Sequence, residues 1–312
     1  MRLLVTGSSG FIGSSLVPKL QQQGHEVYEL NRYYSGHRLQ DDHHLLADVS
    51  DYQTVRNALQ RTQPDVVIHL AAVSPVSYSF ASQEEVLRVN INGPRNVATA
   101  LVELQHGHLI YASSSEVYGQ ARRFPTPEDE PLHATSPYAV SKIASEEMLR
   151  VLHQTSDLAL TILRPFNTFG RAKVGSRHFI VERAITQALQ SHHIHLFNPR
   201  PERDFMFRDD HVAGYLRVLD HLAEVNGETF NLTTGGCWSI AEVAQMIARL
   251  TEQQQGHAVD LTWEGIVDRP LDMDRLQGDG TRAKQLLGWE AQWSLERGLD
   301  QAILEWAKVL KT

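Results

Sequence analysis

Two side chains at helical spacing, Tyr138 and Lys142, have the chemistry of a proton-transfer pair. They follow Ser136-Pro137 at the start of a predicted helix, where residues four apart share one face. A free phenol has a pKa near ~10, and a neighbouring ammonium is expected to lower that pKa. Tyr138 would then take a proton from a hydroxyl while hydride leaves the same carbon. The Tyr-x-x-x-Lys spacing is also common on amphipathic helices, so alone it indicates little.

A polar stretch upstream adds a hydroxyl and a carboxylate to this pair. The segment Tyr111-Ala-Ser113-Ser114-Ser115-Glu116 ends a predicted strand, and α/β enzymes place their sites at the carboxyl ends of parallel strands. We expect Ser114 to hydrogen-bond a reacting oxygen. Glu116, a carboxylate in a largely apolar stretch, is a candidate second base. The alternative is an ordinary polar turn with Glu116 in solvent.

A glycine-rich segment between the first predicted strand and the first predicted helix indicates a phosphate-binding loop. Gly7-Ser-Ser-Gly10-Phe-Ile-Gly13 permits a tight turn and brings backbone N–H groups and the helix dipole toward a pyrophosphate. The spacing is G-x-x-G-x-x-G rather than G-x-G-x-x-G, and a turn needs glycines even without a ligand. Its position in a strand–loop–helix unit favours a dinucleotide.

The ends of the second and third strands bear on which nicotinamide cofactor would bind. An acidic residue ending the second strand accepts from the ribose 2′-OH and favours NAD, but this chain has Asn31 and then Arg32. These side chains tolerate a 2′-phosphate better, so the sequence favours NADP over NAD. The alternative is that Arg32 is a solvated loop cation. Asp48, past the third strand, is expected to accept from the adenine amino group.

Short β-branched runs alternate with amphipathic stretches through the N-terminal half, which predicts right-handed βαβ units around a parallel sheet. Continuously apolar strands fit a sheet that is covered on both faces. The predicted strands are Arg2–Thr6, Glu26–Leu30, Val66–Leu70, His108–Ala112 and Leu160–Arg164. The predicted helices are Ile12–Gln23, Val55–Arg61, Glu84–Leu104 and Tyr138–His153.

The alternation breaks after about Pro165, which divides the predicted fold. We expect an α/β, Rossmann-type doubly wound parallel sheet over residues 1–165 and a smaller C-terminal substrate-binding lobe over 166–312, with roughly 205–235 returning to the sheet. Ser239, with Glu242 three residues on, predicts a capping box. The predicted elements are the helices His178–Gln190, Ile240–Leu250, Thr281–Leu287 and Leu295–Lys308, and the strands Ile194–Phe197 and Phe230–Thr233.

Composition argues against several classes of protein. The 312 residues are 42% hydrophobic and carry a formal charge of −8 with no basic run, so no nucleic-acid partner is expected. A single cysteine, Cys237, allows neither an intrachain disulfide nor a cysteine metal site. Without a signal peptide or an apolar stretch of about 18 residues, we expect no membrane association and a cytoplasmic location. The clusters His43-His44 and His192-His193-Ile194-His195 lack suitably spaced carboxylates, so no metal is predicted.

Further motifs follow these in one order along nearly the whole chain. They are His69-Leu-Ala-Ala72, Asn90, Ser113-Ser-Ser-Glu-Val-Tyr-Gly119, Arg164-Pro-Phe-Asn167-Thr-Phe-Gly170, Arg203-Asp204-Phe205, Asp209-Asp210-His211, Arg269-Pro270-Leu-Asp272 and Leu287-Gly-Trp289. With the glycine loop and Tyr138-x-x-x-Lys142, the set resembles the extended short-chain dehydrogenase/reductase family, the epimerases and dehydratases of nucleotide sugars.

The resemblance implies an NAD(P)-dependent enzyme whose substrate is a nucleotide-diphosphate sugar. Its catalytic triad would be Ser114, Tyr138 and Lys142. The residues implied at the cofactor are Gly7, Gly10, Phe11, Ile12, Gly13, Asn31, Arg32, Asp48, Val49, Leu70, Ala71, Ala72, Asn90, Tyr138 and Lys142.

The resemblance also implies a substrate site. Asn167 is similar to the residue that holds the substrate diphosphate, and Arg203 and Arg269 are similar to the cations that bind the phosphates and ribose of the nucleotide. Ser115 and Asp272 are expected beside the substrate as well. The alternative for the arginines is an ordinary surface ion pair.

Glu116 bears on which reaction the resemblance implies. Plain 4-epimerases usually carry a small or neutral residue there, whereas 4,6-dehydratases and UDP-glucuronate decarboxylases carry a glutamate. A 4-ketone makes the C5 proton acidic, so Glu116 would remove it, water would leave C6, and hydride would return to C6. The dTDP-glucose enzymes place an aspartate before this glutamate, where this chain has Ser115. The pair Ser115-Glu116 looks more like the GDP-mannose enzymes. Asn167-Thr-Phe-Gly-Arg171 departs from the GDP-mannose pattern.

The sequence therefore predicts a nucleotide-sugar 4,6-dehydratase. A nucleotide-sugar 4-epimerase or a UDP-glucuronate decarboxylase on the same scaffold is the alternative. A non-catalytic dinucleotide-sensing module is a third hypothesis, but it predicts a damaged triad, and this triad is intact. By analogy with the family, a homodimer is expected through Glu84–Leu104 and Tyr138–His153 packed as a four-helix bundle.

Overall fold

A parallel sheet forms the centre of the computed structural model, which describes residues 1–33, 42–171, 179–265 and 271–310. Its seven strands run in the order β11-β6-β5-β4-β1-β2-β3. The chain winds outward from β1 in one direction and from β4 in the other, so the topological switch point lies between β1 and β4. The strands are β1 (Arg2–Thr6), β2 (Glu26–Asn31), β3 (His44–Leu46), β4 (Val66–His69), β5 (His108–Ala112), β6 (Ala159–Pro165) and β11 (Thr229–Leu232).

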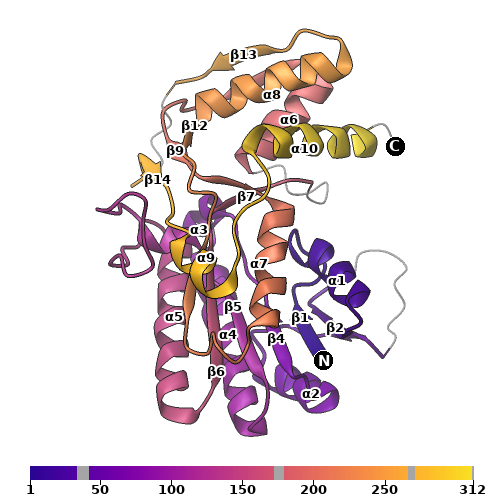
Figure 1. Ribbon diagram of the computed structural model, residues 1–312, viewed down its shortest axis with the longest axis vertical. Coiled ribbons are helices and arrows are strands. Elements are labelled where there is room, and N and C mark those ends of the chain that lie inside the picture. The colour runs from indigo at the N-terminus through magenta and orange to yellow at the C-terminus, as the bar shows by residue number, and fades with distance from the viewer. Residues whose placement is uncertain (34–41, 172–178, 266–270, 311–312) are drawn as a thin grey trace.

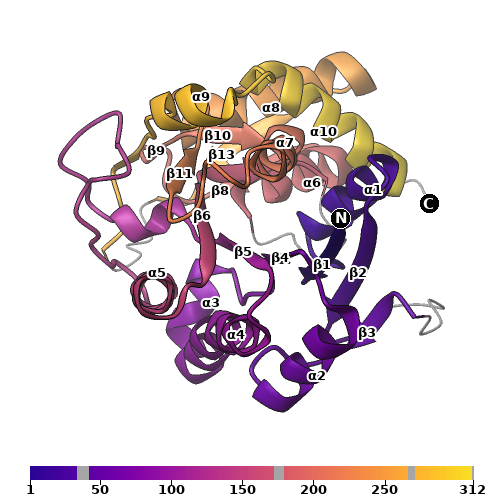
Figure 2. The same ribbon diagram turned by 60° about the horizontal axis from the view of Figure 1, so that its bottom comes forward.

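Helices cover both faces of the sheet (Figures 1 and 2). Alternate strand residues face opposite layers: Leu3 and Val5 pack with α1, α7 and α9, whereas Leu4 packs with α2, α4 and α5. Burial on both faces explains the continuously apolar strands and confirms the predicted doubly wound α/β fold. The flanking helices are α1 (Gly13–Gln22), α2 (Tyr52–Thr62), α3 (Val76–Ala81), α4 (Gln83–Leu104), α5 (Pro137–Ser156), α7 (Arg208–Asp220) and α9 (Thr281–Leu287).

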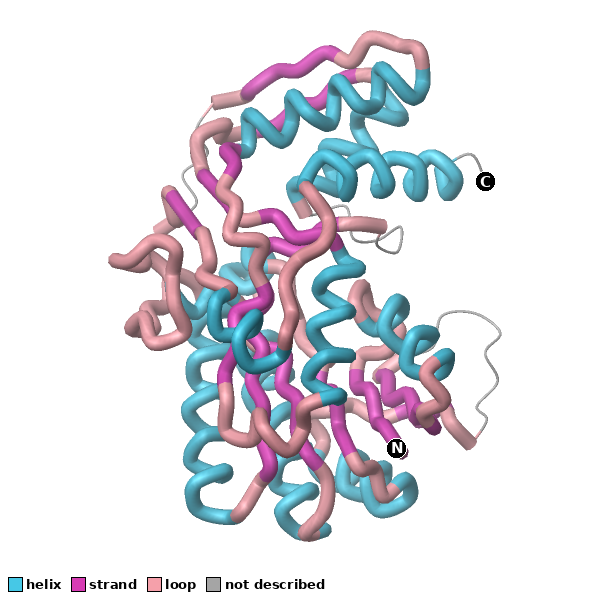
Figure 3. Tube along the Cα trace, viewed as in Figure 1, coloured by secondary structure: helices cyan, strands magenta, loops and turns pink. Residues whose placement is uncertain are grey.

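A smaller lobe, mainly helical, lies above the carboxyl ends of the strands (Figures 1 and 3). Its core is a cluster of buried apolar side chains shared by its helices and by Phe205 and Phe207. Short sheets accompany the lobe, with β7 parallel to β10, β13 parallel to β8, and β9 between β12 and β14. The elements are α6 (Ile180–Ser191), α8 (Ile240–Gln255), α10 (Leu295–Leu310), β7 (Asn167–Phe169), β8 (His193–Leu196), β9 (Glu202–Arg203), β10 (Phe205–Phe207), β12 (Trp238–Ser239), β13 (Asp260–Trp263) and β14 (Arg275–Leu276).

Local signals explain where several helices begin. The hydroxyl of Ser136 accepts a hydrogen bond from Ala139 N at 3.1 Å, and Pro137 occupies the first turn of α5. Ser239 and Glu242 form the predicted capping box at α8. None of the helices in the described ranges combines the length and apolar character needed to cross a bilayer.

The structure differs from the sequence prediction in several elements. Ile12 precedes α1 instead of beginning it, and the predicted strand Ile194–Phe197 lies one residue earlier as β8. The helix expected from His178 starts at Ile180, and residue 178 lies outside the described residues. A short 3-10 helix at Ser115–Tyr118 was not predicted, because four residues are too few to show a period.

Candidate active site

The glycine loop between β1 and α1 packs tightly against the turn after β4. Gly7 has φ of +70°, and a Cβ there would lie 2.9 Å from Ala71 Cα. A Cβ on Gly13 would lie 2.5 Å from the carbonyl oxygen of Gly7. No side chain caps the N-terminus of α1 in the described structure, so its N–H groups are suited to an anion.

The end of β2 braces this loop. Asn31 Oδ1 accepts from Ser9 N at 3.0 Å, and Asn31 Nδ2 donates to Ser8 Oγ at 2.7 Å. The amide predicted to read the ribose is thus engaged with the glycine loop. Arg32 lies beyond it and pairs with Glu85 at 3.4 Å, while Tyr78 OH donates to the same carboxylate at 2.7 Å.

The other predicted cofactor residues line the same edge. Asp48 accepts from Ser50 N at 2.9 Å and pairs with Arg88 at 3.6 Å. Burial raises the pKa of Asp48, but the Ser50 hydrogen bonds and the Arg88 charge outweigh it and hold the pKa below its usual value. Val49, the next residue, is buried in the core. In the glycine loop, the backbone N–H of Gly10 donates to the carbonyl of Gly7.

Two side chains hold the segment 70–73 after β4. Thr6 Oγ1 accepts from Ala71 N at 3.2 Å. Asn90 Oδ1 accepts from Val73 N at 2.8 Å, and Asn90 Nδ2 donates to Ser141 Oγ at 3.0 Å on α5. Asn90 therefore fixes this segment relative to α5, with its amide committed to protein groups.

The glycine loop also contacts the smaller lobe. The Phe11 ring lies 6.4 Å from the ring of Phe179, which precedes α6, and it packs against the apolar core of that lobe. Ile12 packs instead with the apolar layer that contains α1 and α7.

Ser114, Glu116, Tyr138 and Lys142 meet at the carboxyl edge of β5, and we call them the Tyr138 cluster. Ser114 caps the 3-10 helix Ser115–Tyr118 by accepting from Glu116 N at 3.2 Å, and it hydrogen-bonds Tyr138. Tyr138 lies in the first turn of α5. One turn later, Lys142 Nζ lies 5.8 Å from the Tyr138 ring and donates to the carbonyl of Ala112 at 2.7 Å.

Burial governs the protonation of this cluster. It raises the pKa of Tyr138 well above that of a free phenol, the Ser114 hydrogen bond opposes this, and the charge of Glu116 adds to it. Burial also lowers the pKa of Lys142 to about 7, opposed by the charge of Glu146. The predicted lowering of the Tyr138 pKa is therefore wrong, because burial outweighs the opposing hydrogen bond from Ser114.

The predicted substrate residues lie where the smaller lobe faces the sheet edge. Arg203 Nη2 donates to Asp272 Oδ1 at 3.0 Å, although the two residues are 69 positions apart. Asn167 Nδ2 donates to the carbonyl of Asp204 at 3.4 Å. Ser115 is buried at the start of the 3-10 helix, and Arg269 lies outside the described residues.

Sequence reasoning assigned no role to two charged residues behind the cluster, Glu146 and Arg164. They form a buried bidentate ion pair. Their signal was present but weak: Glu146 follows Lys142 by four residues and so shares its helix face. Asp204, also unassigned, accepts from the N atoms of Thr234 and Gly235 at 3.1 and 3.0 Å and thereby ties β9 to the loop after β11.

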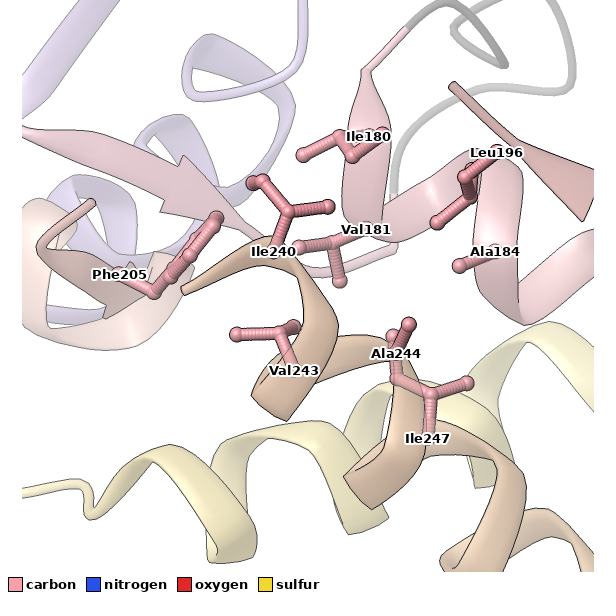
Figure 4. A pocket seen from close by; sticks show the side chains of 9 residues that line it. All are labelled: Ile180, Val181, Ala184, Leu196, Phe205, Ile240, Val243, Ala244 and Ile247. Atoms are coloured by element: carbon pink, nitrogen blue, oxygen red, sulfur yellow. The ribbon is translucent and has the colours of Figure 1, made fainter. Parts of the chain in front are cut away.

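An apolar hollow lies in the smaller lobe, between side chains of α6, β8, β10 and α8 (Figure 4). The space between its side chains is about 170 Å³, part of it open to solvent, and it leaves no room for a water molecule between them. The lining is entirely aliphatic and aromatic: Ile180, Val181, Ala184, Leu196, Phe205, Ile240, Val243, Ala244 and Ile247. Because it offers no polar group to orient a ligand, we assign it to packing. No metal-ligand cluster occurs among the residues that the structure describes.

Comparisons with known proteins identify the family of the chain. The family model described as GDP-mannose 4,6 dehydratase matches residues 4–302. UDP-N-acetyl-alpha-D-glucosaminuronate decarboxylase from Bacillus cytotoxicus is 31% identical, over 99% of this chain and 98% of the relative.

Solved structures resemble the whole chain. UDP-glucose 4-epimerase from Thermotoga maritima, with UDP-glucose, superposes with a TM-score of 0.91 at 27% identity, covering 99% of this chain and 100% of that one. The dTDP-glucose 4,6-dehydratase from Streptomyces venezuelae, with NAD bound, superposes with a TM-score of 0.86 at 26% identity, covering 99% of this chain and 97% of that one. Structural neighbours hold NAD or NADPH. The chain therefore belongs to the extended short-chain dehydrogenase/reductase family of NAD(P)-dependent nucleotide-sugar epimerases, dehydratases and decarboxylases.

Proposed function

We propose that this enzyme is a nucleotide-sugar 4,6-dehydratase, and the carrying observation is Glu116 beside the Ser114–Tyr138 pair. When bound, the nicotinamide cofactor supplies the acceptor and later the donor of hydride. Tyr138 takes the proton of the C4 hydroxyl in its phenolate form, which burial disfavours and a neighbouring positive charge favours. Ser114 holds the same substrate oxygen by a hydrogen bond. Lys142 provides positive charge next to the phenol.

Glu116 then has a task that epimerisation does not need. The ketone at C4 makes the C5–H bond acidic, and the Glu116 carboxylate removes that proton. The carboxylic acid so formed passes its proton to the C6 hydroxyl, which leaves as water. The hydride taken from C4 returns to C6, and one proton returns to C5, which balances the one that Tyr138 took. The reaction therefore consumes no net oxidant and releases one water.

A product assay tests this proposal. Purified protein is incubated with GDP-, UDP-, dTDP- and CDP-hexoses, and products are identified by NMR and mass spectrometry. A 4-keto-6-deoxy sugar, lighter by one water, is expected. Glu116→Gln should lower its formation by about a hundredfold or more. Glu147→Gln, an exposed carboxylate change on α5, serves as the control. Full turnover by Glu116→Gln would exclude this role for Glu116.

The 31% identity to a decarboxylase over nearly the whole chain favours one second candidate, decarboxylation of a nucleotide-linked uronic acid. Such a substrate carries a carboxylate at C6, which leaves as carbon dioxide once C4 is oxidised. Including UDP-glucuronate and its N-acetyl analogue in the panel separates the two. Inversion at C4 with C6 unchanged would indicate an epimerase.

We propose NADP as the preferred cofactor, with Arg32 as the cation for its 2′-phosphate. The carboxylate of Glu85 pairs with Arg32 and would repel that phosphate. Glu85→Gln should raise the ratio of kcat/KM for NADP over NAD by about fivefold, a size expected of a half-exposed charge. Glu84→Gln, on the preceding residue, is the control. A ratio unchanged by both Arg32→Ala and Glu85→Gln would place the 2′-position elsewhere.

We also propose a homodimer through the outer faces of α4 and α5. Val140 and Val151 are 47% and 55% exposed, and both lie on the outward face of α5. Val151→Glu should shift the protein from dimer to monomer in sedimentation velocity. Leu304→Glu on α10, also exposed, should leave the dimer intact. A wild-type monomer at micromolar concentration would refute the proposal.

A further inference from the structure

A buried ion pair lies one helical turn beyond Lys142. Arg164 Nε donates to Glu146 Oε1 at 2.9 Å, and Arg164 Nη2 donates to Glu146 Oε2 at 2.5 Å. The arginine and glutamate side chains are 3% and 0% exposed. Arg150 gives Glu146 Oε2 a further N–H at 3.2 Å. The carboxylate therefore stays ionised in the interior, because three N–H groups and two positive charges surround it.

The carboxylate joins α5 to the end of β5. Ser113 Oγ donates to Glu146 Oε1 at 2.5 Å, and Ser113 directly precedes Ser114 of the Tyr138 cluster. Glu146 itself follows Lys142 by one turn on α5. The backbone that carries the Ser114 hydroxyl is thus tied to the helix that carries the phenol and the ammonium.

The guanidinium joins the same pair to the 3-10 helix. Arg164 Nη1 donates to Tyr118 OH at 2.9 Å, and Tyr118 OH donates to Asn231 Oδ1 at 2.6 Å. Tyr118 is the last residue of the 3-10 helix and lies two residues after Glu116. The position of Glu116 relative to α5 therefore depends on contacts that pass through Arg164.

Stability alone does not account for so deeply buried a pair. Replacing a buried ion pair with apolar side chains of similar volume is often neutral or stabilising. What apolar side chains lack is direction, whereas a bidentate pair fixes both distance and orientation. Three elements of the Tyr138 cluster converge on this one pair, so a geometric role explains it better.

We propose that Glu146 and Arg164 are positioning residues, which together fix the 3-10 helix of Glu116 against α5, and that the Glu146 carboxylate also keeps the Lys142 ammonium charged next to Tyr138. The first half of this inference rests on the proposed dehydratase reaction. The second half concerns the protein itself and is measurable without substrate.

The charge of Lys142 depends on its neighbours, because burial lowers its pKa to about 7. The titratable groups around it are Tyr138 and Glu146 on α5, Tyr111 on β5, His69 on β4 and Glu116 on the 3-10 helix. Tyr111 and Tyr138 are neutral, since burial raises the pKa of each. His69 is neutral as well, since burial lowers its pKa to about 3. The charge of Glu146 raises the pKa of Lys142.

The first test follows the titration of Lys142 in protein labelled with 13C at lysine Cε, by NMR. Removing the charge with Glu146→Gln should lower its titration midpoint by about one pH unit or more. Glu146→Asp, which keeps the charge, should restore most of the shift, and Glu147→Gln should show none. An unchanged midpoint in folded Glu146→Gln would overturn the electrostatic half, whatever the substrate of the enzyme proves to be.

The second test leaves the ion pair intact and cuts its link to the 3-10 helix. Tyr118→Phe should leave the Lys142 midpoint unchanged but slow the step assigned to Glu116. With 4-deuterated and 5-deuterated substrate, the isotope effect on kcat should rise for C5 and fall for C4. Equal isotope effects in wild type and Tyr118→Phe would overturn the positioning half. Absence of any 4-keto-6-deoxy product from the wild type would instead refute the proposed reaction.

Discussion

The sheet edge around α5 and the core of the smaller lobe bury their side chains in opposite ways. Behind Tyr138, the structure encloses Lys142, Glu146 and Arg164 and surrounds them with partners. Between α6, α8 and α10, the enclosed side chains are almost all apolar, and the packing leaves a dry hollow. Buried charge is costly unless it is paired, so a fold tends to keep it where chemistry or geometry needs it. The contrast separates a region of buried, paired charges from a region of apolar packing.

One residue departs from this division. Glu182 on α6 is 1% exposed, and its Oε1 accepts from Gly170 N at 3.0 Å. Burial raises the pKa of Glu182 to about 8. The smaller lobe thus contains a carboxyl that is held neutral, whereas the α5 edge holds its carboxylate ionised.

The largest effect is expected from a substitution in the Tyr138 cluster, which should lower turnover and leave the smaller lobe intact. Tyr138→Phe removes the phenolic proton acceptor, so turnover should fall by about a thousandfold, within the range for general acid–base catalysis. The melting temperature should change by only a few degrees, as checked by circular dichroism. Tyr28→Phe, a change on β2 that removes only a hydroxyl bonded to Glu26 at the surface, is the control. Unfolding of Tyr138→Phe would mean that the phenol supports the fold.

A substitution in the core of the smaller lobe should have the opposite result, lowering stability and leaving turnover intact. Ile247→Ala deletes a fully buried side chain beside the hollow and should cost about 2–5 kcal/mol of unfolding free energy. Turnover per folded molecule should stay within about twofold. Chemical denaturation and kcat measure the two quantities. A large loss of kcat at unchanged stability would show that the hollow belongs to the catalytic machinery.

Measuring stability against pH tests whether Glu182 is neutral in the folded protein. The folded state keeps the Glu182 proton up to a pKa of about 8, whereas the unfolded chain loses it near 4.5. The stability that this carboxyl contributes is therefore complete below pH 4.5 and is lost as pH rises toward 8. The free energy of unfolding of Glu182→Gln should therefore rise relative to that of the wild type as pH rises. The difference should reach roughly 2–4 kcal/mol at pH 8. Parallel stability curves would show that Glu182 ionises freely in the fold.

The smallest effect on stability is expected from a substitution that partly fills the apolar hollow. Ala184→Val adds two methyl groups to its wall and should stabilise the protein by less than about 1 kcal/mol, seen as a slightly higher melting temperature. Ala98→Val, in the close-packed layer between the sheet and α4, should destabilise by overpacking. If both changes lower the melting temperature, the smaller lobe is as tightly packed as the sheet layers.

Periodicity carried most of the fold prediction. Leu3, Leu4 and Val5 show a strand buried on both faces, and the capping box at Ser239 placed the start of α8 correctly. Residues close in sequence or joined by regular structure were also brought together as expected, as with Tyr138 and Lys142 on α5.

What the sequence left open depends on tertiary contact and burial. Nothing local indicates that the Asn31 amide turns to the glycine loop, or that Arg203 meets Asp272. The pKa of Tyr138 was mispredicted for the same reason: spacing places the ammonium nearby but does not reveal how far water is excluded.

The contact of Phe11 with Phe179 makes the two lobes mechanically dependent at one place. The loop suited to an anion cannot swing away from α6 without wetting both aromatic rings, which water disfavours by about 25 cal/mol for each Å² exposed. The glycine loop between β1 and α1 is thus held in position by an apolar contact across the boundary between the two lobes.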